Sequence, residues 1–186
     1  MRSQIITFLL AFILAITVNA AALNKREVSP AKTCINSIEK AGAQLEATKP
    51  DIDNFSNADG YLGALKIHDK EQLIEKLLSK ANDDCCSIHS FTADEVAGVV
   101  GVVTGLVPRV VEVLTSIVSK KLAFDDLVLA TAVAKKDIQK INELTTSLTK
   151  CLLVNKGFLA ENIVGNTLKA QLDNAFSSAI KALETK

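Results

Sequence analysis

The residues of this 186-residue chain that could do chemistry are few: two histidines, four cysteines and scattered carboxylates. A hydrolase needs a nucleophile, a base and a group that orients the base. His68 and His89 are the only histidines, and no G-x-S-x-G turn presents a serine. The glycines between residues 98 and 105 do not follow a strand and match neither phosphate-binding pattern. The sequence therefore predicts a protein that is not an enzyme.

Metal ligation is the next chemistry to weigh, because Cys85, Cys86 and His89 are close in sequence. Adjacent cysteines are poorly spaced for one tetrahedral zinc ion, and no second pair of ligands accompanies them. The Asp-Asp pairs at 83–84 and 125–126 lack the alternating oxygen ligands of a calcium loop. With one tyrosine and no tryptophan, the chain also lacks rings on which bases or sugars stack. We therefore predict neither a metal nor a cofactor.

The N-terminus has the pattern of a secretory signal peptide. Arg2 precedes the apolar run IITFLLAFILAITV, and small residues follow at 19–22, where cleavage would occur. This run is short for a membrane anchor, which is the alternative interpretation. The dibasic pair Lys25-Arg26 suggests a second trimming step. We expect an extracellular protein with a signal peptide over 1–22, or a leader trimmed to residue 26, and a single helical domain over 27–186.

The chain without its leader is weakly acidic. The first 26 residues hold three basic residues and no acid, which leaves 18 basic and 21 acidic residues and a net charge of −3. Affinity for nucleic acid depends on clustered positive charge. We therefore predict no nucleic-acid partner.

Secretion makes disulfide bonds and N-glycosylation the covalent modifications to expect. An even count of four cysteines in a secreted chain predicts two disulfides. Ring strain disfavours a bridge between neighbours, so Cys85 and Cys86 should take separate distant partners, Cys34 and Cys151, in an order that the sequence leaves open. Each bridge would contribute about 2–4 kcal/mol. Asn54 opens an Asn-Phe-Ser acceptor pattern and is a candidate glycosylation site.

The stretch from Val96 to Val118 is the element around which the other helices should be arranged. It is too long for a strand and too apolar for a loop, and Thr92 with Glu95 forms a capping box before it. A helix that is apolar nearly all round lies inside protein or faces lipid. Arg109 and Glu112 argue against a membrane span, so we expect no transmembrane segment in the mature chain.

Two features of this central helix predict its surroundings. Pro108 removes one backbone donor and crowds the carbonyl of Thr104, so we expect a kink or a break there. Three glycines share one narrow face, where a neighbouring helix could approach or an apolar ligand could find room: Gly98, Gly101 and Gly105.

Further helices are predicted from caps, breakers and apolar periodicity. Ser29-Pro30 is a favourable helix start, Pro50 is a stop, and the cleanest period follows Phe124. No segment alternates apolar and polar residues as a strand would. We therefore predict an all-α fold, a single bundle of five to six helices. The expected ranges are 29–50, 61–80, 124–152 and 159–183, with the cysteine pair in a loop at 82–90.

The aliphatic residues suggest a cavity, although a packed bundle core alone would also account for each of them singly. Valine and glycine fill space poorly, and large aromatic residues are scarce. A fatty-acyl chain would gain roughly 0.8 kcal/mol per buried methylene in such a space. Thr104 and Ser116 are weak candidates for contact with a carboxylate head group. The expected lining is Leu62, Leu65, Val99, Val103, Leu106, Val110, Leu114, Leu127, Ile138, Ile141, Leu148, Phe176 and Ile180.

The order of motifs resembles the fungal hydrophobic surface-binding protein A family, which includes the antigenic cell-wall galactomannoproteins. The resemblance rests on an I-x-x-I in the first helix and on three runs: LTSIVSKKLAFDDL (114–127), DIQKINELTTSL (137–148) and LDNAFSSAIKAL (172–183). It implies an all-helical bundle without a catalytic motif. It also implies adsorption to hydrophobic surfaces and, for some members, fatty acids held inside the bundle.

Two functions follow from the residues and the resemblance together. The first is a secreted carrier that holds a fatty acid or similar lipid inside the bundle. The alternative is a protein that coats hydrophobic surfaces or recruits a secreted esterase, with a host protein as a further candidate partner. The chain stops at Glu184-Thr185-Lys186 without an apolar tail, so we expect a freely secreted protein, or one associated with the cell wall without a lipid anchor.

Overall fold

The computed structural model describes residues 29–155 and 162–184, and these are almost entirely helical with no strand among them. The all-α prediction is confirmed. The predicted signal peptide, the Lys25-Arg26 site and the last residues of the chain lie outside the described residues. Five long helices and two short ones follow in order: α2 (Pro30–Asn54), η1 (Asn57–Asp59), α3 (Gly60–Cys86), α4 (Ala93–Ser119), α5 (Lys121–Asp125), α6 (Ala130–Val154) and α7 (Asn162–Glu184).

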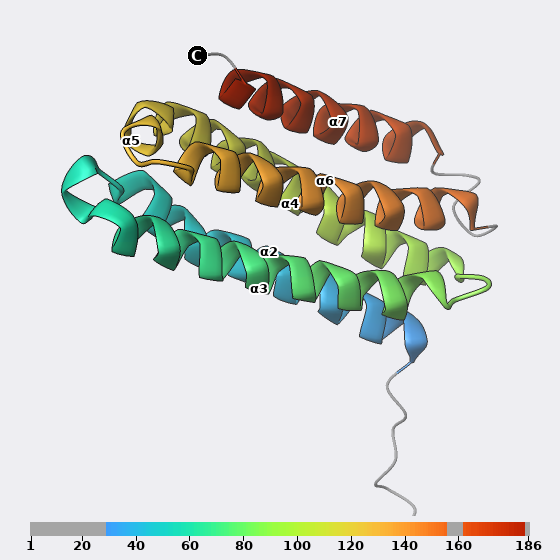
Figure 1. Ribbon diagram of the computed structural model, residues 1–186. Helices are drawn as coiled ribbons and strands as arrows, with labels where there is room; N and C mark the ends of the chain where they lie inside the picture. The colour runs from blue at the N-terminus through green and yellow to red at the C-terminus, as the bar shows by residue number, and fades with distance from the viewer. Residues whose placement is uncertain (1–28, 156–161, 185–186) are drawn as a thin grey trace, which may run out of the picture.

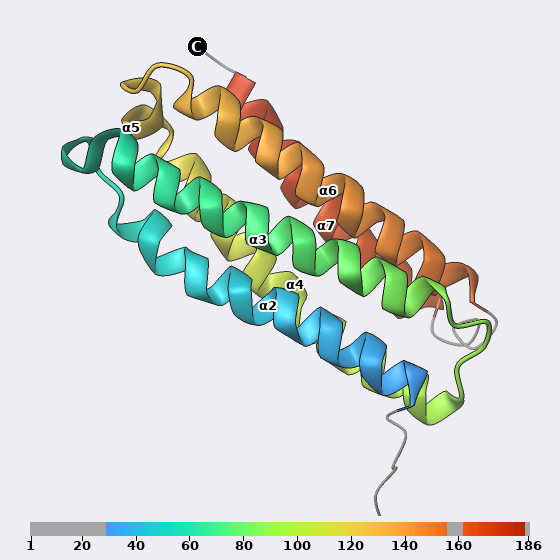
Figure 2. The same ribbon diagram turned by 60° about the horizontal axis from the view of Figure 1, so that its bottom comes forward.

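The five long helices form a closed ring (Figures 1 and 2). Going round it, α2 packs against α3, α3 against α6, α6 against α7, α7 against α4, and α4 against α2. The helices α2, α4 and α7 run in one direction along the bundle, and α3 and α6 run in the other. No helix occupies the axis, so the interior is filled only by side chains that reach inward from the ring.

The predicted helix starts are confirmed by their hydrogen bonds. Ser29 caps α2 by accepting from the backbone N–H of Lys32, and Pro30 opens the helix. Thr92 and Glu95 form a reciprocal capping box at the start of α4, with the N–H of Thr92 donating to the Glu95 carboxylate at 2.9 Å. Both caps satisfy backbone donors that a helix cannot satisfy itself.

Proline does not interrupt either of the helices that contain it. Of the two outcomes predicted at Pro108, a kink or a break, the structure excludes the break, because α4 continues through it. Pro108 and Thr104 lie on the exposed side of α4, where water can satisfy the carbonyl that loses its partner. The predicted stop at Pro50 is wrong as well, since α2 continues to Asn54.

Two other boundaries differ from the prediction. α3 extends to Cys86, so the cysteine pair lies on its last turn and not in a loop. The helix expected from Phe124 is divided into α5 and α6, with Leu129 at a φ of 72° between them. This left-handed backbone conformation is costly for a leucine, and no periodicity in the sequence marks it.

The disulfides join Cys34 to Cys85 and Cys86 to Cys151, which resolves the pairing left open by the sequence. Successive residues on a helix point about 100° apart. Cys85 therefore faces α2 while Cys86 faces α6, the two neighbours of α3 in the ring. The disulfides connect α2, α3 and α6 into one covalent unit.

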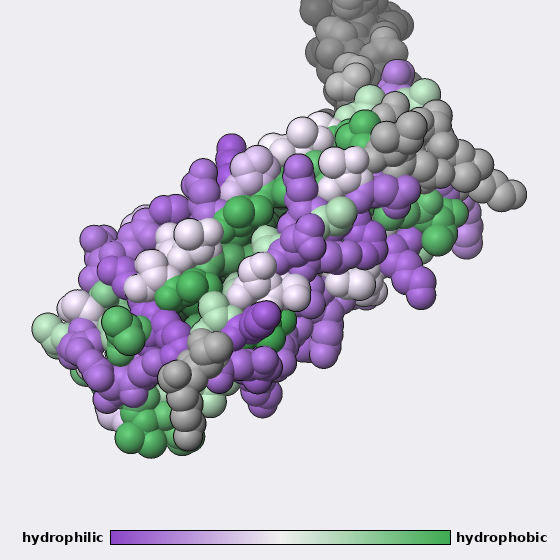
Figure 3. Space-filling model, turned by 90° about the horizontal axis from the view of Figure 1, so that it is seen from above, coloured by the Kyte–Doolittle hydropathy of each residue, from purple (hydrophilic) through white to green (hydrophobic). Residues whose placement is uncertain are grey.

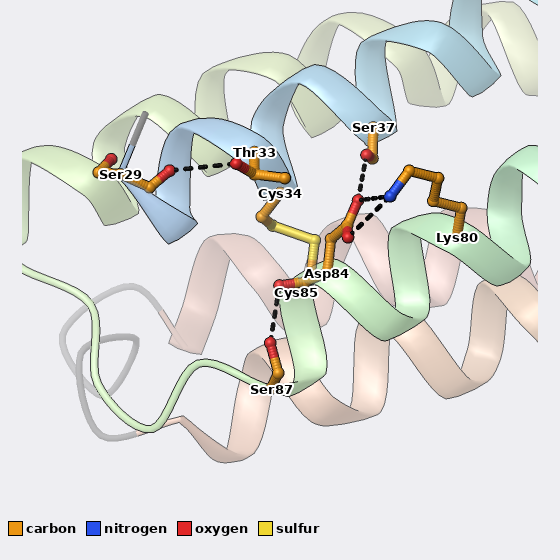
Figure 4. Close-up of polar contacts among 8 residues, drawn as sticks. All are labelled: Ser29, Thr33, Cys34, Ser37, Lys80, Asp84, Cys85 and Ser87. Carbon is orange, nitrogen blue, oxygen red and sulfur yellow. Dashed lines mark hydrogen bonds and ion pairs between the residues drawn. A yellow bond between two sulfur atoms is a disulfide. The ribbon is translucent and has the colours of Figure 1, made fainter. Parts of the chain in front are cut away.

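A polar cluster supports the first disulfide (Figure 4). The Ser37 hydroxyl on α2 donates to Asp84 Oδ2 at 2.5 Å, and Lys80 Nζ donates to both Asp84 oxygens at 3.0 and 2.9 Å. The hydrogen bond from Ser37, reinforced by Lys80, holds the pKa of the Asp84 carboxyl below its usual value against the opposing effect of burial. These contacts join α2 and α3 next to the Cys34–Cys85 bridge.

By length and composition α4 could cross a membrane, and it is the one such helix among the described residues. In the structure it packs between α2 and α7. Its inward residues include Val99, Val107 and Leu114, which are buried. Only 22% of its most apolar stretch is buried in the bundle, so packing accounts for its inward side alone.

Removal of either disulfide should destabilise the fold. Since each bridge closes a loop of more than 50 residues, the double variants Cys34→Ala/Cys85→Ala and Cys86→Ala/Cys151→Ala should each lower the free energy of unfolding by about 2–4 kcal/mol. Guanidinium unfolding followed by circular dichroism measures this. An unchanged midpoint in either double variant would contradict the stabilising role of that bridge.

Candidate functional site

An apolar cavity of about 150 Å³ lies within the ring. Side chains from all five long helices line it, and most of them are branched aliphatic residues. Seen from the side of α7, hydrophobic side chains follow the length of the molecule between hydrophilic borders (Figure 3). The cavity is the feature of the described residues best suited to binding a ligand.

The cavity lies where two halves of the core meet. One buried cluster surrounds Phe176 and the other surrounds the Cys34–Cys85 bridge, and Val103 packs against both. Aromatic residues are buried toward the two ends of the bundle, outside the cavity lining. Phe55 and Phe124 stack with ring centroids 4.6 Å apart at one end, and Phe91 is buried at the other.

Nine residues of the predicted lining lie at the cavity wall, and four do not. Leu127 and Ile180 pack against the core cluster around Phe176 but not against the cavity. Leu62 and Leu65 are corrections, because they are 81% and 53% exposed on the outer side of α3. The nine at the wall are Val99, Val103, Leu106, Val110, Leu114, Ile138, Ile141, Leu148 and Phe176.

The error on α3 has a physical cause. The inward stripe of this helix is formed by Ile67, Glu71, Ile74 and Leu78, and Glu71 is only 4% exposed. A buried glutamate at the centre of the stripe makes that face look like solvent-facing surface in the sequence. The leucines on the other side of the helix therefore give the clearer apolar pattern in the sequence.

Of the three glycines predicted to share one face of α4, only Gly98 meets a neighbouring helix, where Ile35 Cδ1 of α2 lies 3.0 Å from the position of a Cβ. Gly101 and Gly105 of α4 are exposed, with no atom within 4 Å of the position a Cβ would occupy. Gly42 of α2 lines the cavity instead, and a Cβ there would lie 2.3 Å from Leu106 Cδ2. Its missing side chain makes room for Leu106 of α4.

Few polar side chains reach the cavity wall. Thr48 and Thr149 donate to backbone carbonyls of their own helices, at 2.7 and 2.8 Å. The charged residue types at the wall are Glu71 of α3 and Lys169 of α7. The predicted head-group candidates do not contribute: Thr104 is exposed, and neither it nor Ser116 is among the lining residues.

Glu71 belongs to a buried polar network between α3 and α6. Its carboxyl is hydrogen-bonded to Asp137, which is 3% exposed, and His68 Nδ1 lies 2.6 Å from Asp137 Oδ2. Gln72 Nε2 also donates to Asp137 at 3.4 Å. Burial, followed by the adjacent Asp137 carboxylate, raises the pKa of Glu71 well above its usual value. A protonated Glu71 that donates to Asp137 accounts for these contacts.

Metal-binding residue types occur together once among the described residues. The ligand atoms of His68, Glu71 and Asp137 all lie within 4.8 Å of one another. Their hydrogen bonds to one another and to Gln72 already pair the Asp137 carboxylate. The other candidate set is not available for a metal, because Cys85 and Cys86 are both in disulfides.

The model of the hydrophobic surface binding protein A family matches residues 31–153, more than half of the chain. The chain belongs to this family. The family resemblance seen in the sequence is thus confirmed. The matched region spans α2, α3, α4 and most of α6, and so includes the helices that carry both disulfides. Comparison with curated protein sequences gave no match.

Solved structures show that other proteins share the bundle of this family member. The Aspergillus protein AfMP4p, solved in complex with palmitic acid, is 22% identical with a TM-score of 0.78, over 83% of this chain and 99% of that one. Ligand-binding domain 1 of the Penicillium marneffei MP1 protein, solved with arachidonic acids, is 17% identical with a TM-score of 0.72, over 86% and 100%. Domain 2 of the same protein, solved with multiple arachidonic acids, is 13% identical with a TM-score of 0.71, over 88% and 99%. At these identities the likeness is one of fold.

The raised pKa of Glu71 predicts a specific dependence of stability on pH. The folded protein keeps this proton in a range where the unfolded chain has released it, so stability should fall as pH rises from the ordinary value of 4.5 toward the raised pKa. Glu71→Gln cannot lose the proton, so its free energy of unfolding should decline less than that of the wild type between about pH 5 and 8. The matched control is Glu143→Gln, on the exposed side of α6. Parallel pH profiles for the wild type and Glu71→Gln would show that Glu71 ionises normally.

Proposed function

We propose that this protein is a secreted, non-enzymatic lipid carrier that holds a fatty acid or similar apolar ligand in the cavity of its helical ring. The observation that carries the proposal is the apolar cavity lined by all five long helices. The fatty acids in the solved structures of similar fold support it. The two disulfides suit a protein of an oxidising, extracellular compartment.

The cavity volume sets a limit on the ligand. At about 150 Å³ it matches an engineered protein cavity that admits benzene. About six buried methylenes would contribute roughly 5 kcal/mol before ordering costs. A longer acyl chain therefore requires helices of the ring to move apart, or part of the chain to remain outside.

Extraction of the purified protein tests the proposal directly. Organic extraction followed by mass spectrometry should detect bound fatty acid, or the delipidated protein should take up added decanoate in calorimetry. The proposal would be overturned if no lipid is extracted and no added fatty acid or fatty alcohol binds.

A bulkier side chain in the cavity should block the ligand. Val103 lies at the cavity wall and packs against both core clusters. Val103→Phe should weaken decanoate binding at least about tenfold, because the ring occupies the space of several methylenes. Ala97→Phe, on the exposed side of the same helix, is the matched control and should bind normally. Undiminished binding by a folded Val103→Phe variant would place the ligand elsewhere.

A second function, adsorption to hydrophobic surfaces, is favoured by exposed apolar residues at one end of the bundle. Seven large hydrophobic residues from the start of α3, from α5 and from the segment around the start of α6 form this apolar tip: Tyr61, Leu62, Leu65, Leu122, Val128, Leu129 and Val133. The Tyr61 hydroxyl donates to the Val128 carbonyl at 3.4 Å, which joins α3 to the α5–α6 segment. Hydrophobic side chains are visible at this end in Figure 3. Contiguous exposed apolar surface marks interaction sites, and a secreted esterase or a host protein would be a partner of this second function.

The two functions can be separated by substitution at the tip. Leu62 is 81% and Leu129 72% exposed, so Leu62→Glu/Leu129→Asn should leave the fold intact, since asparagine tolerates the positive φ of position 129. Adsorption to octyl-coated beads should fall about fivefold or more, and decanoate binding should be unchanged. Val111→Glu/Val154→Asn changes exposed valines away from the tip and serves as the control. Equal adsorption of both variants would contradict a role for the tip.

A further inference from the structure

The cavity wall contains one acidic and one basic residue, on two different helices of the ring. Glu71 comes from α3 and Lys169 from α7, two helices that are not neighbours. Branched aliphatic side chains form most of the remaining wall. A ligand with a polar end would meet two different environments at these two places.

Lys169 lies at the seam between α6 and α7. Gly165, one turn earlier on α7, approaches Leu153 of α6, and a Cβ on it would lie 2.5 Å from Leu153 Cδ2. Lys135 Nζ and Glu184 Oε1 are 2.8 Å apart further along the same antiparallel pair. This register places Lys169 beside Thr149, which also lines the cavity.

The ammonium of Lys169 is accessible and has donors to spare. It forms an ion pair with Asp173 one turn along α7, and its side chain is 35% exposed. An ammonium has three donors, so the ion pair leaves others for a second anion. Its aliphatic stem contributes to the apolar wall while the charge remains near water.

The α3 side of the cavity wall disfavours an anion. Asp137 is buried there beside the protonated Glu71, and Glu75 lies nearby, so a carboxylate would meet the like charge of Asp137. The positively charged residue types in that region already have partners. His68 contacts Asp137, and the charges of Lys136 and Lys140 lower the pKa of Glu75. An anionic head group would therefore be stabilised on the α7 side only.

We propose that Lys169 is the head-group site of the lipid cavity and selects ligands with an anionic end, namely free fatty acids over alcohols or esters of the same chain length. This inference rests on the carrier function proposed above. The acyl chain extends from the α6–α7 seam toward the centre of the ring. Asp173 competes with the ligand carboxylate for the same ammonium.

Two substitutions of opposite effect test the proposal. Lys169→Met keeps the aliphatic stem and should weaken decanoate binding about five- to tenfold while changing 1-decanol binding less than about twofold. Asp173→Asn should strengthen decanoate binding about two- to fivefold, because it removes the competing carboxylate. Lys181→Met, on the exposed side of the same helix, should bind both ligands like the wild type. Calorimetry at pH 8, where decanoate is ionised, provides the affinities.

The outcomes separate this proposal from the carrier function. Binding of both ligands that is unaffected by Lys169→Met, or weakened equally for acid and alcohol, would overturn the head-group site and leave the carrier function standing. A decrease in decanoate affinity for Asp173→Asn would also overturn it, because a purely structural ion pair would be lost in both variants. If neither ligand binds the wild type, the carrier function fails and the head-group site fails with it.

Discussion

The structure depends on the packing of five long helices in a ring with none on its axis. Helices in contact lie about 8–10 Å apart, so a ring of five leaves an interior that inward side chains must fill. Here those side chains are mainly valine, leucine and isoleucine, and Phe176 is one of the few large rings among them. The cavity follows from the number of helices and the size of these residues.

The polar network between α3 and α6 shows that the helical ring can bury two carboxyl groups. Two buried carboxyl groups are costly unless a proton or a positive partner compensates them. Glu71 lies next to Asp137, and Asp137 is also contacted by His68 and Gln72. The network makes one wall of the apolar cavity polar. The two sides of the cavity therefore differ chemically, which an aliphatic lining alone would not achieve.

The sequence was informative wherever local chemistry decides the outcome. The capping residues Ser29 and Thr92 fixed two helix starts, and the aliphatic stripe of α4 supplied most of the predicted residues that lie at the cavity wall. What it could not supply depends on the order of helices around the ring. The disulfide pairing required knowing that α3 lies between α2 and α6, and Glu71 was hidden because a buried acid resembles surface in a periodic pattern.

The placement of the cysteines divides the ring into two mechanically unequal parts. Disulfides join α2, α3 and α6, whereas α4 and α7 carry no cysteine and are held against them by packing and by ion pairs such as Arg109–Glu46 and Lys135–Glu184. A ligand larger than the cavity would meet least resistance on the α4–α7 side. These two helices could move outward while the disulfides hold α2, α3 and α6 in place. The bridges would then do more than stabilise the fold, since they restrain α2, α3 and α6 against such a movement.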